Sequence, residues 1–346
     1  MEFAPVPLDE AEGKILGHNV IDGSGRRLLR KGRALSAEDV ELLRGLGRST
    51  VWTAALAEGD VEENEAALRS TESAVAGAVR LAGPSTGRVN IHATELGVVE
   101  VAPDGLLAFN ECSGFTLATL RSGSVVRPDR MVATTKILPY AVSRDSLQQA
   151  LDTSQRFGPL VRVRALPRRA VGLVVTASAA TVGKVTAGFE KALGLRLEGL
   201  GSGLRWIDRV VHDDAASEPT EERIARTILE QIDAGADLVL LAGETAIQDE
   251  SDQAPRAVEL AGGEVITFGA PVDPGNLLML GDVRGTAIVG APGCARSPKR
   301  NIVDIVLPQL LLGERLNAVE IQRLGHGGLL EDVPERPLPR HRIDED

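Results

Sequence analysis

The feature that most constrains this chain is a regular alternation of apolar strands and amphipathic helices between residues 170 and 313. Residues 170–176 and 237–241 are almost continuously apolar, which is typical of strands that are covered on both faces. Residues 218–234 lie between them and carry isoleucines four positions apart, the spacing of a buried helix face. We therefore predict an α/β domain with a doubly wound, mostly parallel sheet and helices on both sides.

The first 160 residues differ from this pattern and predict a smaller N-terminal region that is α+β and rich in β-structure. A helix should begin after Ser36, because Ser36 and Asp39 have the spacing of a capping box. Apolar residues at helical spacing predict a long helix over residues 61–81, whereas residues 86–142 alternate apolar and polar side chains like strands. We therefore expect a small α/β unit (1–60), a helix with a β-rich region (61–160), a Pro- and Arg-rich linker (157–169), the α/β domain (170–313) and a disordered tail (331–346).

Charge and composition exclude several classes of protein. With 38 basic and 49 acidic residues the chain has a net charge of -11, which argues against a general nucleic-acid-binding surface. No apolar run approaches the roughly 20 residues of a membrane-spanning helix, and the N-terminus lacks a signal pattern. Cys112 and Cys294 are too few for a disulfide framework or a zinc cluster. We expect a soluble, cytoplasmic protein without a membrane or nucleic-acid partner.

Two Pro-Gly loops between residues 271 and 299 indicate the kind of ligand. They flank a short apolar strand at residues 287–290. Proline fixes φ and glycine lets a ligand approach the backbone, so each loop can present N–H groups to an anion. Lys299 and an arginine of the second loop add side-chain donors for phosphate or carboxylate. The loops therefore predict a phosphorylated ligand bound by Pro274, Gly275, Asn276, Pro292, Gly293, Cys294, Arg296 and Ser297. We interpret Cys294 as a small residue in a tight turn, not a nucleophile, because no paired base is evident.

Other loops should reach the same edge of the sheet, because ligands of parallel sheets bind at the carboxyl ends of the strands. Thr176 follows the first strand of the domain, and Gly243, Glu244 and Thr245 follow the strand that ends at Leu241. Small and hydroxyl-bearing residues at these positions leave room for a ligand and offer it hydrogen bonds. We therefore include them in the predicted site.

Four carboxylates fall in these loops, and each has two interpretations. Asp213 and Asp214 follow His212, while Asp249 and Asp252 precede the helix predicted from Pro255. As structural groups they cap helices and carry solvated charge; as site residues they suit a magnesium–phosphate complex. We interpret His212 as structural.

Residues 170–313 resemble the molybdopterin-binding domain shared by molybdopterin adenylyltransferases and molybdopterin molybdotransferases. The resemblance rests on residues 210–214 and 237–252, on Pro274-Gly275, and on residues 291–293. The whole chain is similar to a bacterial branch of that superfamily, whose members stand alone or precede a cytidylyltransferase-type domain; further matching segments are 11–14, 30–35, 87–90 and 136–139. Glu244 departs from the Gly-Gly pair of the family, so a carboxylate stands where the backbone would approach a phosphate. It would either repel a terminal phosphate or help to hold a metal.

The resemblance implies two alternative functions. A binding protein would hold molybdopterin or the finished molybdenum cofactor and pass it to a molybdenum hydroxylase, with a nucleotidyltransferase as another candidate partner. An enzyme would adenylate molybdopterin or insert molybdate, with Mg²⁺ held by Asp249 or Asp252 as catalytic and metal-binding residues. Pyrophosphate release from molybdopterin, ATP and Mg²⁺ distinguishes the two. We also expect a homo-oligomer.

Overall fold

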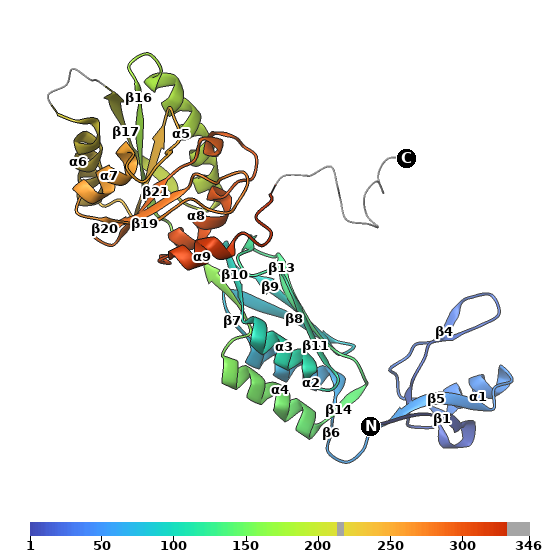
Figure 1. The fold of residues 1–346 in the computed structure, drawn as a ribbon. Helices are drawn as coiled ribbons and strands as arrows, with labels where there is room; N and C mark the ends of the chain where they lie inside the picture. Colours follow the sequence, from blue (N-terminus) through green and yellow to red (C-terminus); the bar gives the residue numbers. More distant parts are fainter. Residues whose placement is uncertain (213–217, 331–346) are drawn as a thin grey trace. The chain divides into compact units, whose positions relative to one another are not determined.

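The computed structural model describes residues 1–212 and 218–330 and divides the chain into two compact units (Figure 1). Unit 1 is Met1–Ala165 and unit 2 begins at Leu166. The boundary falls inside the predicted linker, but the linker is shorter than predicted because Val161–Ala165 forms strand β15 of unit 1. Only residues 166–169 lie between this strand and the first strand of unit 2.

Residues 1–60 of unit 1 contain a three-stranded antiparallel sheet, a two-stranded ribbon and one α-helix. Helix α1 (Ala37–Gly45) begins as predicted, because the Ser36 hydroxyl accepts from the Asp39 amide and the Asp39 carboxylate accepts from the Ser36 amide. Its buried residue Leu43 packs into a small core of its own. The remaining elements are β1 (Glu2–Pro7), η1 (Leu8–Glu10), β2 (Ile15–Leu16), β3 (Val20–Ile21), β4 (Arg27–Leu29) and β5 (Thr50–Ala55).

Residues 61–165 contain two four-stranded sheets, in the orders β12-β10-β15-β7 and β11-β13-β9-β8, around a second core. Phe109 and Phe115 meet edge to face in this core, with ring centroids 5.8 Å apart. The strands are β6 (Asp60–Glu62), β7 (Val75–Gly77), β8 (Val79–Ser85), β9 (Arg88–Ala93), β10 (Gly97–Val101), β11 (Phe115–Thr119), β12 (Val125–Val126), β13 (Met131–Ile137) and β14 (Ala141–Ser143). The helices are α2 (Glu63–Ala74), α3 (Pro103–Glu111) and α4 (Arg144–Phe157).

The long helix predicted over residues 61–81 is wrong in its second half. Helix α2 ends at Ala74, and the chain continues into β7, which pairs in parallel with β15. Gly77 has a φ of +81°, and a Cβ there would collide with the Val163 carbonyl oxygen. This backbone position is incompatible with a helix and requires glycine.

A six-stranded sheet forms the centre of unit 2 and confirms the predicted α/β fold class. Its order is β17-β16-β18-β21-β20-β19; the first four strands are parallel, and β20 is antiparallel to both of its neighbours. The strands are β16 (Ala170–Ser178), β17 (Gly203–His212), β18 (Leu238–Gly243), β19 (Glu264–Phe268), β20 (Met279–Val283) and β21 (Thr286–Gly290). The helices are α5 (Val182–Gly199), α6 (Thr220–Asp233), α7 (Gln253–Leu260), η2 (Gly293–Arg296), α8 (Val303–Leu311) and α9 (Ala318–Arg323).

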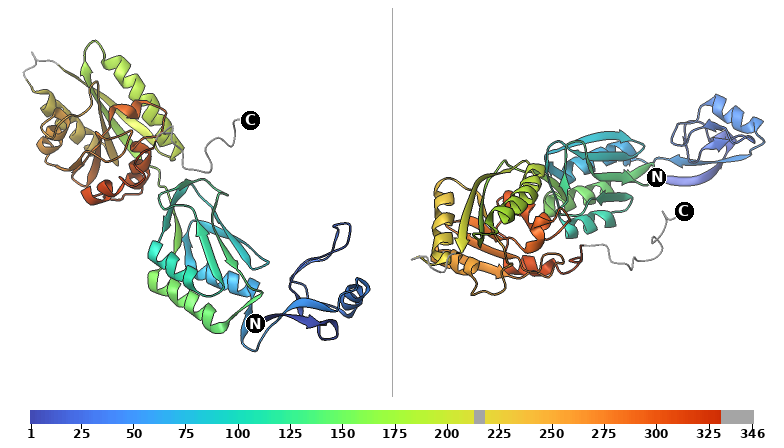
Figure 2. Two further views of the ribbon diagram at one scale, coloured as in Figure 1. Left: turned by 45° about the vertical axis from the view of Figure 1, so that its right-hand side comes forward. Right: turned by 90° about the horizontal axis from the view of Figure 1, so that it is seen from above.

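Helices cover both faces of this sheet, as the apolar strands predicted (Figure 2). On β16, Leu173 and Val175 pack into the core beneath α5 and α8, whereas Val174 packs into the core beneath α6 and α7. Ile224 and Ile228 of α6 are buried in the core beneath α6 and α7, at the predicted helical spacing. Within the described residues, no helix is both long and apolar enough to cross a bilayer.

The two Pro-Gly loops flank two strands and not one. Strands β20 and β21 form an antiparallel hairpin, whose turn contains Arg284 and Gly285 with φ values of +53° and +84°. Because the hairpin reverses the chain, the loop before β20 and the loop after β21 lie at the same end of the sheet. The extra strand therefore brings the two loops together.

Candidate functional site

The carboxyl ends of β16, β17, β18 and β21 lie at one edge of the unit 2 sheet. In the strand register Ser178 is opposite His212, and Thr176 is opposite Gly243. Gly290 at the end of β21 is opposite Leu241 of β18. The loops that follow these strands therefore meet at the edge where open α/β sheets bind ligands. Asp213 and Asp214, which the sequence also assigned to this edge, lie outside the described residues.

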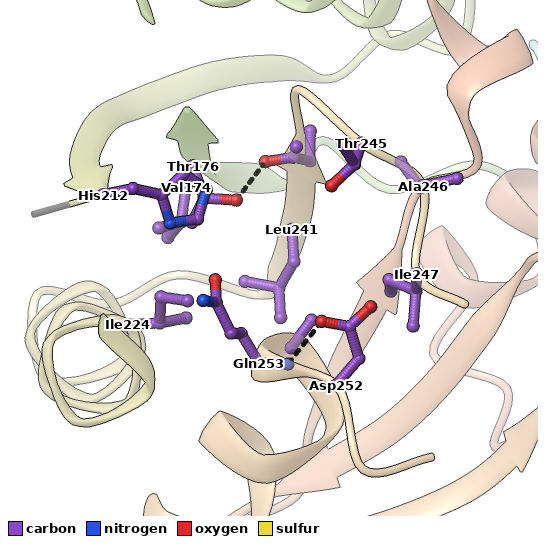
Figure 3. A pocket seen from close by; sticks show the side chains of 14 residues that line it. Val174, Thr176, His212, Ile224, Leu241, Thr245, Ala246, Ile247, Asp252 and Gln253 are labelled. Carbon is purple, nitrogen blue, oxygen red and sulfur yellow. Dashed lines mark hydrogen bonds between the residues drawn. The ribbon is translucent and has the colours of Figure 1, made fainter. Parts of the chain in front are cut away.

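A pocket opens at this edge between β16, β17 and β18 on one side and the start of α7 on the other. Figure 3 shows Thr176 and His212 on one side and Asp252 and Gln253 on the other, with Leu241 between them. Aliphatic side chains form much of the wall, and the hydroxyl, imidazole, amide and carboxylate groups lie around it. The remaining lining residues are Val174, Ile224, Ala242, Gly243, Thr245, Ala246, Ile247, Ala254 and Ala291.

Asp249 and Asp252 both accept hydrogen bonds from nearby backbone amides. Asp252 is the N-cap of α7: its Oδ1 accepts from the Gln253 amide at 2.7 Å and its Oδ2 from the Gln248 amide at 3.1 Å. Asp249 Oδ1 accepts from the Ser251 amide at 2.8 Å, which lowers the pKa of the Asp249 carboxyl. Asp252 therefore has the capping geometry of the structural interpretation and also faces the pocket, whereas Asp249 closes a turn ahead of the helix and caps none. Among the described residues, no group of three or more His, Cys, Asp or Glu side chains is arranged to hold a metal ion.

Glu244 turns towards the loop between β16 and α5 and does not line the pocket. Its carboxylate Oε2 accepts from the Ser178 amide at 3.0 Å, and this bond is the main cause of the lowered pKa of Glu244. The Glu244 amide donates to the Thr176 carbonyl at 2.9 Å, which fixes the turn after β18. Gly243 is needed at this turn, because a Cβ would lie 2.8 Å from the Thr245 carbonyl oxygen.

The two Pro-Gly loops are joined through the residues that precede α8. The Ile302 amide donates to the Pro274 carbonyl at 3.1 Å, and the Asn301 side chain donates to the Cys294 carbonyl at 3.3 Å. Gly275 has a φ of +138°, and a Cβ there would collide with the Ile302 side chain, so packing explains this glycine. A Cβ at Gly293 meets no atom within 4 Å, so the second loop has open space in front of its glycine.

Arg196 of α5 holds the second Pro-Gly loop in place through hydrogen bonds to its backbone. Its side chain is only 9% exposed, and the guanidinium donates to the carbonyls of Ala295 (3.1 Å), Ser297 (2.7 Å) and Lys299 (3.0 Å). It also forms a 2.9 Å ion pair with Asp304 of α8. Sequence reasoning missed this residue, because an arginine in an amphipathic helix is usually solvated.

Two of the side chains predicted to bind the ligand from the second loop, those of Arg296 and Cys294, have packing roles. The Arg296 guanidinium lies over the Phe189 ring of α5, 5.4 Å from the ring centroid. Burial raises the pKa of the Cys294 thiol, which keeps it neutral and agrees with its interpretation as a packing residue.

The predicted site residues thus lie at the carboxyl edge of the sheet, but on two different faces of it. Thr176, Gly243, Thr245 and Asp252 line the pocket on the α6 and α7 side. The second Pro-Gly loop packs on α5, and it is connected to the pocket through Ala291. His212 and Gln253 also line the pocket. The sequence analysis interpreted His212 as structural and did not consider Gln253. The only signals in the sequence were that His212 follows a strand and that Gln253 lies at the start of a helix.

Comparisons with known proteins give limited similarity. A protein-family model described as a domain of unknown function (DUF8806) matches residues 5–55. No curated protein matches the chain. The chain is similar in structure to a molybdenum cofactor biosynthesis protein from Pyrococcus furiosus, with 12% identity, a TM-score of 0.25, and coverage of 93% of this chain and 65% of the other.

Two further solved structures are similar. One is a molybdopterin biosynthesis MoeA protein from Pyrococcus horikoshii, with 13% identity, a TM-score of 0.29, and coverage of 90% of this chain and 75% of the other. The other is the molybdopterin biosynthesis Mog protein from Mycobacterium ulcerans, with 18% identity, a TM-score of 0.27, and coverage of 41% of this chain and 92% of the other. All three TM-scores are below 0.5.

Proposed function

We propose that this chain binds molybdopterin or the molybdenum cofactor at the carboxyl edge of the unit 2 sheet, during synthesis of the cofactor or its delivery to molybdenum enzymes. The observation that carries the proposal is the meeting of both Pro-Gly loops at this edge, joined through Asn301 and Ile302 and continuous with the pocket through Ala291. These loops are also the segments in which the sequence most resembles molybdopterin-binding domains.

The chemistry of the edge suits the two parts of such a ligand. The partly exposed side chains of Ala246, Ile247 and Ala254 offer an aliphatic surface for a flat ring. Thr176 and Gln253 offer polar groups beside it. The backbone N–H groups of the second Pro-Gly loop suit the ligand's phosphate. Within this proposal the side chains orient the ring, and the loop backbone binds the anionic end.

The test of this function is the substitution Gly293→Val. A Cβ at this position meets no atom within 4 Å, so we expect the fold to persist while the valine side chain fills the space in front of the loop. Affinity for molybdopterin, measured by calorimetry under anaerobic conditions, should fall to the limit of detection. Gly199→Val is the matched control, because Gly199 also has open space around it but lies at the far end of α5. Equal affinity of the folded Gly293→Val variant and the control would refute the assignment.

Adenylyl or molybdate transfer is a second candidate function, favoured by the position of Asp252 in the pocket lining. Both Asp252 oxygens already accept backbone hydrogen bonds, so the residue suits only a magnesium ion that takes most of its ligands from phosphates and water. Asp252, together with Asp249 three residues before it, would hold that ion against the ligand phosphates, and the ion would offset the negative charge of the phosphates.

Asparagine substitutions separate the two candidate functions. Asp252→Asn still caps α7 but is a poor magnesium ligand, so an enzyme should lose pyrophosphate release while its melting temperature stays unchanged. If the wild-type protein shows no turnover with molybdopterin, Mg²⁺ and any nucleotide, the transferase function is rejected and the binding function is retained.

A further inference from the structure

Unit 1 contains a cavity of its own, about 480 Å³ in volume, which the proposed function does not use. This volume lies within the usual range of small-molecule sites, about 300–1,000 Å³. Residues 30–32 and 136–140 line it, together with Phe3, Gly17, His18, Glu63 and Thr86. The Tyr140 hydroxyl donates to the Gly17 carbonyl at 2.8 Å, which joins lining residues that are far apart in the sequence.

Aromatic side chains form one wall of this cavity. The antiparallel register of β1 and β5 places Phe3 opposite Ala54, so Phe3 and Trp52 share a face of the sheet, and their ring centroids lie 5.2 Å apart. His18 packs edge to face on the Phe3 ring, and the Tyr140 ring centroid lies 6.4 Å from that of Phe3. Only 3% of the chain is Phe, Trp or Tyr, yet three such side chains gather here, and Phe3 and Trp52 remain 40% and 44% exposed. A partly exposed aromatic wall of this kind suits a flat ring that stacks on it.

The turn after β4 supplies positive charge to the same cavity. Arg30 and Lys31 line it, and within the described parts of the chain neither side chain forms an ion pair or a hydrogen bond. The backbone of the turn is fixed, because the Lys31 amide donates to Asn19 Oδ1 at 2.9 Å. An arginine and a lysine beside an aromatic wall suit the phosphate group of a ligand.

The third basic side chain of the lining, that of Lys136, is already paired. Its Nζ lies 3.2 Å from Glu63 Oε2 and donates to the Thr86 carbonyl at 2.8 Å. Among the described lining residues Glu63 is the only acidic one, and Lys136 balances its charge. Arg30 and Lys31 therefore make the cavity positive, in a chain whose net charge is -11.

We propose that this cavity is a second ligand site, in which Arg30 and Lys31 bind the phosphate group of a small molecule and the Phe3 ring, packed against Trp52, stacks on its flat aromatic ring. Nucleotides have this chemistry, and molybdopterin has it too. The site is independent of the proposed function, because all of its residues lie in unit 1.

The experiment uses the full-length protein with Trp206→Phe, so that Trp52 is the remaining tryptophan and its fluorescence reports on unit 1. ADP is the probe, and it should change this fluorescence in a saturable way. Adenosine lacks the phosphates and inorganic pyrophosphate lacks the ring, so each should bind about tenfold more weakly than ADP in calorimetric titration.

Two variants separate the contributions of the charge and the ring. Arg30→Gln should weaken ADP binding about tenfold, the loss expected for one charge-assisted hydrogen bond. Arg27→Gln is the matched control, because it makes the same change at an exposed arginine of β4 that does not line the cavity, and it should leave affinity unchanged. Phe3→Leu keeps an apolar side chain without the ring, and should weaken ADP binding about tenfold while pyrophosphate binding stays the same.

An equal loss in Arg30→Gln and Arg27→Gln would overturn the proposal, since it would indicate a general charge effect. Pyrophosphate that binds as tightly as ADP would also overturn it, because the aromatic wall would then contribute nothing; this comparison replaces Phe3→Leu if that variant does not fold. If ADP gives no saturable response, molybdopterin is titrated against the same variants: binding that depends on Arg30 identifies the pterin as the ligand, and its absence rejects the site. Gly293→Val should leave the Trp52 response unchanged, so failure of this site and failure of the proposed function are distinguishable.

Discussion

Replacing Arg196 by methionine should destabilise unit 2 and loosen the second Pro-Gly loop. The guanidinium donates to three loop carbonyls and pairs with Asp304, and it is almost fully buried. Methionine keeps much of the apolar stem and has a similar helix propensity. The substitution therefore measures the contribution of the guanidinium group to stability. Without it the carbonyls of Ala295 and Ser297 lose the guanidinium as a donor, whereas the Asp304 carboxylate and the Lys299 carbonyl keep hydrogen bonds from Asn301.

The expected loss is set by the burial of the ion pair. Breaking a buried pair costs about 3–5 kcal/mol, and the low end applies here because the Asp304 side chain is 30% exposed and water can replace part of the interaction. We therefore expect a loss of about 3 kcal/mol in the free energy of unfolding. With a urea slope of about 2 kcal/mol per molar, the unfolding midpoint should fall by about 1.5 M.

The two tryptophans allow unit 2 to be observed separately. Trp52 lies in unit 1 and Trp206 in β17, so fluorescence in a Trp52→Phe background reports on unit 2 during urea unfolding. Lys191→Met is the matched control, an exposed residue of the same helix, and should change stability by less than about 0.5 kcal/mol. Native-state trypsin should also cleave after Lys299 faster in the Arg196→Met variant. Equal midpoints for the Arg196 and Lys191 variants would refute the role given to Arg196.

Two further predictions concern stability. Gly172→Ala places a Cβ against the buried Gln231 side chain, and should cost about 2 kcal/mol by overpacking; Gln231→Ala in the same chain should restore part of the loss in a double-mutant cycle, and additive losses would contradict the contact. The lowered pKa of Asp249 means that its ionised form stabilises the fold. The stability difference between wild type and Asp249→Asn should be present above the ordinary value of 3.8 and vanish as pH falls through the lower folded pKa, measured by urea unfolding at several pH values. A difference that grows on acidification would contradict this sign.

Much of unit 2 could be predicted from the sequence because its sheet is covered on both faces. Residues of β16 alternate between two cores, so the whole strand is apolar, and the buried residues of α6 recur at helical spacing. Such patterns are local, and they identify strands and helices without knowledge of their neighbours.

The end of α2 could not be predicted in this way, because distant contacts decide it. Residues 75–81 contain apolar side chains that suit either a helix or a strand. The choice is made by pairing of β7 with β15 and by the close approach of Gly77 to the Val163 carbonyl. Both partners lie far along the chain, so no local pattern reports them.

The candidate site shows the same limit. The Pro-Gly loops were visible in the sequence, but with one strand between them they would have lain at opposite ends of the sheet. Strand β20 was missed because Gly281 and Asp282 interrupt its apolar pattern. Its antiparallel pairing with β21 is what puts both loops at the carboxyl edge.

The charged residues at this edge are used mainly to hold the loops themselves. Arg196 binds carbonyls of the second Pro-Gly loop, Glu244 binds the turn before α5, and Asp252 caps α7. Each of the three residues forms hydrogen bonds with backbone groups of a loop or helix start, and these bonds fix the conformation of the loops. Within the proposed function, recognition of the ligand at this edge relies on backbone N–H groups, hydroxyls and the aliphatic part of the pocket wall. Residue types alone therefore suggested a metal–phosphate centre, whereas in the structure these charged groups hold loops in place.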